Sequence, residues 1–398
     1  MGRKCPMGFF NNYSKGGDNM SKNIKAICWK RVKDLYGKKP EERVKNRLNK
    51  ELSLIYQNES SEWYEIAKDI VDMCESDGYH VFSRYSTAGA FVNYLCGISE
   101  INPLEPHYRC PNCKYVEFVD DDIFKCGYDL PLKSCPSCGE NMIADGVNIP
   151  MESYFGLKES RRTFPHIYLG VPAKYCEASK KKFETIYGQE DFIDDVMPHW
   201  GLEMYRDLEK FTSIKVQDIL LSYSFFRVGL YNCDFLEENL KSMISYLKPK
   251  TFEELVRTLA LYHSTGAWKG TGQLLYNRYD FFLKDLICVR EDVMEYMLKL
   301  GASREDAYYF MEYVRKGLGA DFFFKEEGQD FCKKYELPSW FIATTSNIKY
   351  LPLKAHMVSY AMMIIRLSWY KQNYPQEFCW ACPIKCKDES CKLQIKCG

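Results

Sequence analysis

The sequence predicts an α+β fold that is mostly helical, and three observations lead to this expectation. Apolar residues recur at helical spacing before residue 80 and again from about residue 213 onward. Only two short stretches, residues 80–91 and 160–172, contain a strand pattern. Between them lies a cysteine-rich segment, residues 99–150, which contains two Cys-Pro-x-Cys pairs. A chain of 398 residues can hold two or three domains of this kind.

Two amphipathic helices are expected before residue 80. The first begins after Pro40, because proline suits a first helical turn and Glu41 and Glu42 oppose the positive end of the helix dipole. Its apolar face consists of Val44, Leu48, Leu52 and Ile55. The second helix runs from about Ser60 to Gly78, with the glycine at its C-terminal cap. Its apolar stripe consists of Trp63, Ile66, Ile70 and Cys74.

The two strand patterns are each followed by a helix. Residues 80–91, HVFSRYSTAGAF, predict a short strand, then a turn containing serine and glycine, then a helix. A strand within residues 160–172 leads into a helix from Lys174 to Tyr187 that ends at Gly188. A small acidic loop follows, with carboxylates at Asp191, Asp194 and Asp195.

From about residue 213 the pattern is nearly all helical. Thr251 and Glu254 predict a capping box before an apolar-periodic run, and Ser303 predicts the cap of another helix. Pro338 opens a further helix, and residues 354–370 form a long one.

Two Cys-Pro-x-Cys pairs mark the cysteine-rich segment. Cys110 pairs with Cys113 and Cys135 with Cys138, and 21 residues separate the two pairs. Thiolates at this spacing can turn onto one ion, and two such pairs complete a tetrahedral zinc site. A four-cysteine site has no open position, so the predicted Zn²⁺ is structural; four unliganded buried thiols are the alternative. Cys126 lies between the pairs and could compete as a ligand.

The C-terminal end holds a second group of cysteines. Cys379 and Cys382 have knuckle spacing, and Cys386, Cys391 and Cys397 follow within a short distance. The spacing of the later three is irregular. This group predicts either a second metal site formed by Cys379, Cys382, Cys386 and Cys391 or a loose, redox-sensitive tail.

Charge is balanced over the chain but not along it. Lys+Arg and Asp+Glu are both 54, whereas the first 50 residues carry 14 basic and four acidic side chains. Such a basic arm suits DNA; a solvated, partly disordered tail is the alternative. The N-terminal sequence has no signal-peptide pattern, and no stretch of about 18 apolar residues predicts a membrane span. Reduced cysteines in a cytoplasmic protein are therefore expected.

Several motifs resemble the alpha subunit of DNA polymerase III of the PolC type. The segments ISEINPLEPHYRCPNCKYVEF, GYDLP and CPSCG are similar to the zinc-bearing insertion of that family. DLYGKKPEERVKNRLNKELSLI and DGYHVFSRYSTAGAF resemble the segments before the insertion. KPKTFEELVRTLALYHSTGAW, REDVMEYMLKLGASREDAYYFMEYVRKGLG and IKYLPLKAHMVSYAMMIIRLSWYKQNYP resemble its helical fingers, so the resemblance covers most of residues 25–375.

The resemblance implies an α+β fold made of a degenerate polymerase III-type palm remnant, a four-Cys zinc module and a helical fingers-like domain. The expected domains are a flexible N-terminal tail (1–20), the N-terminal part of the palm remnant (21–105), a zinc-binding insertion (106–150), the C-terminal part of the palm remnant (151–212), a fingers-like domain (213–375) and a Cys-rich tail (376–398). The exonuclease and PHP regions of the family have no counterpart in this sequence.

The departures from the family concern its chemistry. The resemblance places the family's Asp-x-Asp pair, which holds two magnesium ions, at His166 and Tyr168. The segment with the third aspartate has no counterpart here. Phe82 and Tyr85 stand where the family's triphosphate loop has glycines. No catalytic residue is therefore expected, and neither is Mg²⁺, which prefers oxygen ligands. Asp191, Asp194 and Asp195 could substitute, but a solvated turn is the better interpretation.

Other family positions keep residues that suit phosphate. The resemblance implies nucleotide or DNA contacts at Ser83, Arg84, Ser86, Arg315, Lys316, Lys354 and His356. The alternative for Arg315 and Lys316 is ordinary compensation of a helix dipole at its C-terminal end. The alternative for His166 and Tyr168 is packing on one face of a strand.

These observations predict a non-catalytic DNA-binding or replisome-associated protein, with a mobile genetic element as its expected source. A decoy or inhibitor of host replication is a protein-interaction form of the same hypothesis. The alternative, from another class, is an active DNA-directed DNA polymerase with a rebuilt metal site. Assays of primer extension and of DNA binding distinguish the non-catalytic hypothesis from the active-polymerase alternative.

Overall fold

The computed structural model describes residues 23–120, 123–157, 166–187, 196–199, 201–222, 230 and 235–382. The predicted N-terminal tail, the acidic loop of Asp191, Asp194 and Asp195, and the last three tail cysteines lie outside these residues. The described chain is α+β and mostly helical, with small sheets, as predicted. No helix in the described ranges is both long and apolar enough to cross a membrane.

The N-terminal part (residues 23–105 and 151–199) consists of helices around one three-stranded sheet. The helices are α1 (Ile24–Tyr36), α2 (Glu42–Gln57), α3 (Ser61–Ser76), η1 (Tyr85–Gly89), α4 (Phe91–Leu95), α5 (Glu152–Phe155) and α6 (Ala173–Tyr187). The strands are β1 (Phe82–Ser83), β5 (Leu169–Val171) and β6 (Val196–Pro198), in the order β1-β5-β6. β1 pairs antiparallel with β5, and β5 pairs parallel with β6.

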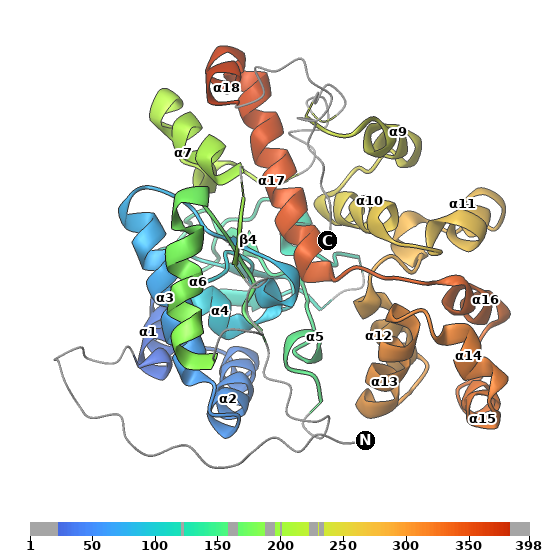
Figure 1. Cartoon of the computed structure of the whole chain (residues 1–398). Helices are drawn as coiled ribbons and strands as arrows, with labels where there is room; N and C mark the ends of the chain where they lie inside the picture. The colour runs from blue at the N-terminus through green and yellow to red at the C-terminus, as the bar shows by residue number, and fades with distance from the viewer. Residues whose placement is uncertain are drawn as a thin grey trace.

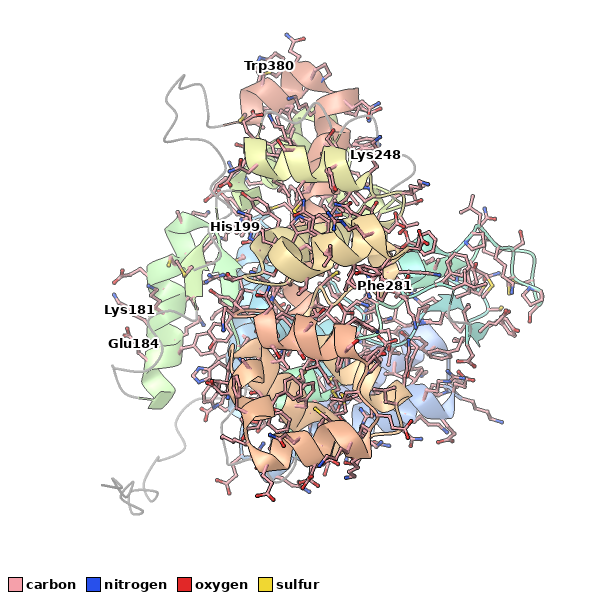
Figure 2. All side chains as sticks on the ribbon, turned by 90° about the vertical axis from the view of Figure 1, so that its right-hand side faces the viewer. Lys181, Glu184, His199, Lys248, Phe281 and Trp380 are labelled. Atoms are coloured by element: carbon pink, nitrogen blue, oxygen red, sulfur yellow. The ribbon has the colours of Figure 1, made fainter. Side chains whose placement is uncertain are left out.

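The four-cysteine module (residues 106–150) holds a second sheet. Its strands are β2 (His107–Arg109), β3 (Val116–Phe118) and β4 (Ile143–Asp145), with β2 in the centre and both pairings antiparallel. A short helix, η2 (Gly127–Asp129), lies between β3 and β4. The module has its own small core, which consists of Tyr108, Cys110, Leu130, Cys135 and Met142. In Figure 2 it projects from the side of the molecule.

The helical part (residues 201–382) makes up the rest. Its helices are α7 (Gly201–Thr212), η3 (Val216–Asp218), α9 (Glu238–Leu247), α10 (Phe252–His263), η5 (Trp268–Gly272), α11 (Gln273–Arg278), η6 (Leu283–Asp285), α12 (Arg290–Lys299), α13 (Arg304–Arg315), α14 (Gly319–Phe324), α15 (Glu326–Lys334), α16 (Ser339–Asn347), α17 (Lys354–Asn373) and α18 (Pro375–Ala381). Figure 1 shows α17 running through the middle, with α10 to α16 on one side and the N-terminal helices on the other.

The helix signals of the sequence are borne out. The face of α2 formed by Val44, Leu48, Leu52 and Ile55 is buried. Ser303 accepts the N–H of Asp306 at 3.0 Å, and Thr251 accepts the N–H of Glu254 at 3.1 Å. The return bond of the predicted box differs, because Glu254 accepts the N–H of Lys250, at 2.6 Å, instead of that of Thr251.

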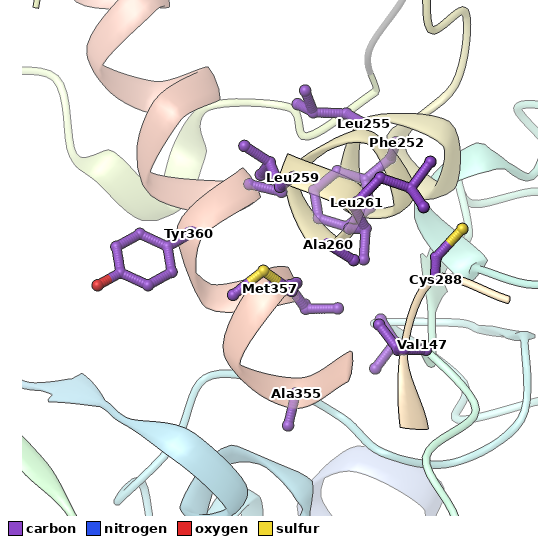
Figure 3. Close-up of a cluster of buried hydrophobic side chains, with 14 of the residues drawn as sticks. Val147, Phe252, Leu255, Leu259, Ala260, Leu261, Cys288, Ala355, Met357 and Tyr360 are labelled. Atoms are coloured by element: carbon purple, nitrogen blue, oxygen red, sulfur yellow. The ribbon is translucent and has the colours of Figure 1, made fainter. Parts of the chain in front are cut away.

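Two larger cores form around these elements. The N-terminal core joins α1 to α4 with β5 and β6, whereas the other spans the helical part. α7, which the sequence assigned to the palm remnant, contributes Met204 and Leu208 to the core of the helical part. Figure 3 shows the centre of that core, where Leu259 and Ala260 of α10 lie on the side of α17 that carries Met357.

α17 is tied to the N-terminal part along its length. His356 Nδ1 accepts the N–H of Tyr85 at 3.1 Å. One turn further, the Ser359 hydroxyl donates to the Ser83 carbonyl at 3.2 Å. Near the other end, Arg366 Nη1 donates to Glu100 Oε1 at 2.7 Å. One helix therefore belongs to the helical core and holds the N-terminal part as well.

Candidate functional site

The four cysteines of the module meet as the sequence predicts. Their sulfur atoms all lie within 4.8 Å of one another, with Cys110–Cys138 and Cys113–Cys135 at 3.5 Å each. Tetrahedral zinc with bonds of about 2.3 Å separates its sulfurs by roughly 3.8 Å, so the arrangement suits such an ion. The cluster could hold a metal such as zinc.

The two knuckles repeat the same backbone geometry. The N–H of Cys110 donates to the Tyr115 carbonyl at 2.8 Å, and that of Cys135 donates to the Glu140 carbonyl at 2.7 Å. The residue after each second cysteine has a left-handed φ, +64° at Lys114 and +75° at Gly139. The repeat explains how both pairs aim their sulfurs at one point.

Thiolate formation is favoured at Cys110. Desolvation acts against it, but the backbone N–H groups of Cys113 and Asn112 lower the pKa of the Cys110 thiol to about 6. The Cys113 N–H lies 3.4 Å from the Cys110 sulfur. At Cys113 the Tyr115 backbone hydrogen bond lowers the pKa of the thiol, but desolvation and the neighbouring cysteines raise it to about 12. Without a metal, the first knuckle therefore favours one thiolate, at Cys110.

Cys126 is not part of this group, and the expectation that it could compete as a ligand is wrong. It is fully buried in the core of the helical part, where burial raises the pKa of its thiol. The described residues contain one group of three or more metal-ligand side chains close enough to share an ion, and it consists of the four module cysteines.

Asp145 at the end of β4 anchors the module to the N-terminal part. Its carboxylate accepts from Arg109 Nε at 3.1 Å, from Asn102 Nδ2 at 3.0 Å and from the Tyr94 hydroxyl at 3.1 Å. Burial alone raises the pKa of Asp145, but Arg109 and the hydrogen bonds hold it below its usual range. A buried charge with this many donors fixes the sheet in place.

Asp129 links the module to the helical part, and sequence reasoning missed it. Its carboxylate accepts the N–H groups of Phe252 and Glu253, at 2.5 and 2.9 Å, at the beginning of α10. A carboxylate there satisfies unpaired N–H groups and opposes the helix dipole. Burial raises the pKa of Asp129 to about 6, although the two N–H groups act the other way. Its only signal was its place in the GYDLP motif.

His166 and Tyr168 lie in a run of rings that we call the aromatic–imidazole cluster. Its members are Trp63, Tyr85, His166, Tyr168, His356 and Tyr360. Tyr168 lies 5.0 Å from Tyr85 and 5.7 Å from His166 between ring centroids. The rings of Tyr85 and His356 stack at 5.0 Å. Among the described residues, His166 does not belong to a group of His, Cys, Asp or Glu side chains that could share a metal ion.

Tyr85 keeps a backbone conformation that suits glycine. Its φ is +48°, in the left-handed region that bulky residues rarely adopt. The loop around it holds the predicted phosphate residues. The Ser83 hydroxyl donates to the Ile98 carbonyl at 2.6 Å, and Ser86 is half-buried in η1. The Arg84 guanidinium lies over the Tyr85 ring, 4.9 Å from its centroid.

Four groups that can carry positive charge converge at this loop: Arg84, His199, His263 and His356. Burial, followed by the nearby Arg84 and the other two histidines, lowers the pKa of His356 to about 3. Burial and Arg84 also lower the pKa of His199 to about 4. Arg84 Nη1 and His263 Nε2 are buried and have no hydrogen-bond partner within the described chain. His199 and His356 are therefore uncharged near neutral pH, and Arg84 supplies the positive charge that an anion would meet here.

The other predicted contacts lie apart from this loop. Arg315 Nη2 and Lys316 Nζ lie 2.7 and 3.3 Å from Glu312 Oε2, one turn back on α13. Lys354 is buried, with its Nζ 3.4 Å from Glu253, and its N–H donates to Glu291 at 3.0 Å. Lys354 also lines a cavity of about 440 Å³ between α2 and α12. The structure thus brings Ser83, Arg84, Ser86 and His356 together, without the other three.

The C-terminal pair Cys379 and Cys382 is not a knuckle. Cys379 lies in α18 and Cys382 caps its end, because Pro375 opens a helix that runs through the pair. Cys379 is exposed, whereas Cys382 is half-buried. Cys386 and Cys391 lie outside the described residues, so the second metal site stays a prediction.

Residues 22–199 match the family model described as "Bacterial DNA polymerase III alpha NTPase domain". The "DNA polymerase III PolC-type" of Thermotoga petrophila is 28% identical over 477 residues, covering 91% of this chain and 34% of that protein. That of Caldanaerobacter subterraneus is 28% identical, covering 94% and 34%, and that of Lactococcus lactis is 26% identical, covering 90% and 29%. This chain is a relative of the PolC-type DNA polymerase III.

The chain spans about a third of the length of these PolC-type relatives. The alignment with the Thermotoga protein has 477 positions, whereas this chain has 398 residues, so at least 79 positions of the relative have no counterpart here. The matched regions of this PolC relative include the four-cysteine module, the loop of Arg84 and the strand after His166 and Tyr168.

Proposed function

We propose that this PolC relative binds DNA without transferring nucleotides and works as a non-catalytic, replisome-associated protein. A decoy that occupies DNA or partners of a host polymerase is one form of this role. The proposal concerns this chain alone, because the chain spans only about a third of the length of its PolC-type relatives.

One observation carries the proposal. The resemblance puts the catalytic carboxylate pair at His166 and Tyr168, and both side chains pack against aromatic rings. Nucleotidyl transfer through two magnesium ions needs oxygen ligands at that point. An imidazole and a phenol stacked against neighbouring rings offer no carboxylate to replace the pair.

Two further features support binding to phosphate. Beside the loop of Arg84, the buried Arg84 Nη1 and His263 Nε2 have no hydrogen-bond partner among the described residues, and an anion would satisfy them. The N-terminal part also has exposed basic side chains on α1, on the loop after it and on α2. They are Lys25, Lys30, Arg31, Lys33, Lys38, Lys39 and Lys50, none of which forms an ion pair with a described residue. Unpaired lysines and arginines release condensed cations when they meet DNA.

Primer extension tests the catalytic half of the proposal. Protein purified free of host polymerase is given primer–template, all four deoxynucleotides and Mg²⁺ or Mn²⁺. We expect no extension above that of a buffer control. Template-dependent incorporation would contradict the proposal and favour the active-polymerase alternative, with Asp191, Asp194 and Asp195 as the next residues to replace.

DNA binding over a salt series tests the other half. Affinity should fall steeply with salt, with a slope of about −0.7 to −0.9 per phosphate contact. Replacing Lys30, Lys33 and Lys39 with glutamine should flatten the slope by roughly two to three. The matched control replaces Lys325, Lys333 and Lys334, which lie around α15 on the opposite side of the molecule in Figure 1. If single-stranded, duplex and primer–template DNA all fail to bind at low salt, the DNA role is wrong and a protein partner should be sought.

A further inference from the structure

A second cavity lies where the helical part meets the four-cysteine module. Its volume is about 400 Å³, enough for a nucleoside monophosphate. Lys125 of the module lines one side, and residues of η6, α12 and α16 line the others. Phe281 marks its position on the face toward the viewer in Figure 2.

Aromatic rings form one wall of this cavity. The Trp340 ring lies 5.0 Å from Phe281 and 5.1 Å from Tyr296, edge to face in both pairs. Tyr279 completes the lining and is 61% exposed, so its ring is open to solvent. Next along the chain, Phe282 is 66% exposed. Adjacent aromatic rings that stay exposed beside a cavity indicate a surface that meets a ligand.

Four carboxylates line this cavity; Glu295 and Asp292 form ion pairs, whereas Asp280 and Asp285 form none with a described residue. Glu295 pairs with Lys125 at 3.0 Å and with Lys299 at 3.3 Å. Asp292 pairs with the buried Arg257 at 2.9 Å. Lys284 is exposed and forms no ion pair with a described residue, so one cation beside the exposed ring is free for a phosphate.

We propose that this cavity is a stacking site for a base of single-stranded DNA. The base lies against Tyr279 and the wall of Phe281 and Trp340, and Lys284 meets the adjoining phosphate. Every base offers a flat π-face, so the site holds a strand without reading its sequence. A duplex keeps its bases stacked inside and gains nothing from the rings. The site rests on the proposed DNA binding and adds to it a preference for single strands.

The experiment compares the whole chain and its variants with a fluorescent dT15 and a blunt duplex of 15 base pairs. Tyr279→Ala should weaken dT15 binding about five- to tenfold and leave duplex binding unchanged, because it removes one stacking ring. Tyr279→Trp should restore binding, since any large ring can stack. Tyr309→Ala, at a similarly exposed tyrosine on α13, is the matched control and should change nothing.

The lysine has a separate readout. Lys284→Gln should lower the magnitude of the dT15 salt slope by about 0.7, whereas Tyr279→Ala should leave the slope unchanged. Photo-crosslinking with 5-iododeoxyuridine in the strand should map to Tyr279, Phe281 or Trp340. If dT15 binds but Tyr279→Ala has no effect and the crosslink maps elsewhere, the stacking site is wrong while DNA binding stands. If no DNA binds at all, both proposals fail.

Discussion

At the residue scale, Tyr85 and Lys114 both have the left-handed backbone conformation that favours glycine. Tyr85 has φ +48° at a position where the resemblance implies a glycine. A bulky residue keeps such a conformation only where its surroundings impose it. Here the Tyr85 N–H donates to His356, and the Tyr85 ring stacks on the His356 ring and meets the Tyr168 ring edge to face. The loop backbone therefore has a conformation that favours glycine, and the Tyr85 ring occupies the space beside it.

Lys114 allows a direct test of the conformational strain of a non-glycine residue at positive φ. It has φ +64° in the first knuckle, at the place that Gly139 takes in the second. Lys114→Gly should stabilise the metal-loaded protein by about 0.5–1 kcal/mol, because glycine adopts this φ freely. Urea denaturation of the variant measures the change.

Gly139→Ala is the matched control. A Cβ at Gly139 would meet nothing within 4 Å, so its only effect is backbone strain at φ +75°. It should destabilise by about 1 kcal/mol. A loss of stability in Lys114→Gly, or no change in Gly139→Ala, would show that the knuckles are held by something other than backbone conformation.

At the element scale, the bond between η2 and α10 makes stability depend on pH. Burial raises the pKa of Asp129 in the folded chain to about 6, whereas the unfolded value is near 3.8. The folded state therefore binds the proton more tightly than the unfolded state does. The stability from this group is complete below the unfolded pKa and is lost as pH rises through the folded one.

Asp129→Asn removes this dependence. Relative to the unmodified chain, the variant should gain stability as pH rises from about 4 to about 6, by up to roughly 3 kcal/mol for two pKa units. Urea denaturation of both proteins at several pH values measures the difference. Asp330→Asn, at an exposed carboxylate on α15, is the control. A constant difference between Asp129→Asn and the unmodified chain at all pH values would contradict the assignment.

The elements themselves were largely predictable. Helices such as α2 and α13 bury one apolar face, so spacing and caps reveal them. The strands were harder, because β1 has two residues and β5 three, too few for an alternating pattern. Contacts between distant segments were beyond prediction. Nothing in the sequence indicates that Asp129 caps α10 or that Tyr85 meets His356, which are 123 and 271 residues apart.

The metal site was predictable for a different reason. The two Cys-Pro-x-Cys pairs encode their own local geometry, so spacing alone identified all four residues. The predicted nucleotide and DNA contacts rested on the resemblance to the family and not on spacing within this sequence. Ser83, Arg84 and His356 do meet, but Lys354 turns to a carboxylate in the interior.

At the scale of the whole molecule, removal of the metal should destabilise residues outside the four-cysteine module as well as inside it. Cys135→Ser should abolish binding of one zinc per chain and lower the urea midpoint, because it breaks the tetrahedral set. The N-terminal turn of α10 should exchange its amide hydrogens faster, since Asp129 loses its support. Metal analysis and hydrogen exchange measure both effects. Cys379→Ser, at an exposed thiol outside the group, is the control; full zinc content in Cys135→Ser would rule out the site.

The three ties along α17 have a mechanical consequence. His356, Ser359 and Arg366 hold the N-terminal part to the same helix that packs on α10. A hinge between the two parts would have to break these bonds or rotate the helix inside its own core. Close-packed cores resist such rotation and transmit strain instead. We therefore expect the N-terminal and helical parts to move as one rigid body. Binding of a DNA strand to one part should then change the strain in the other.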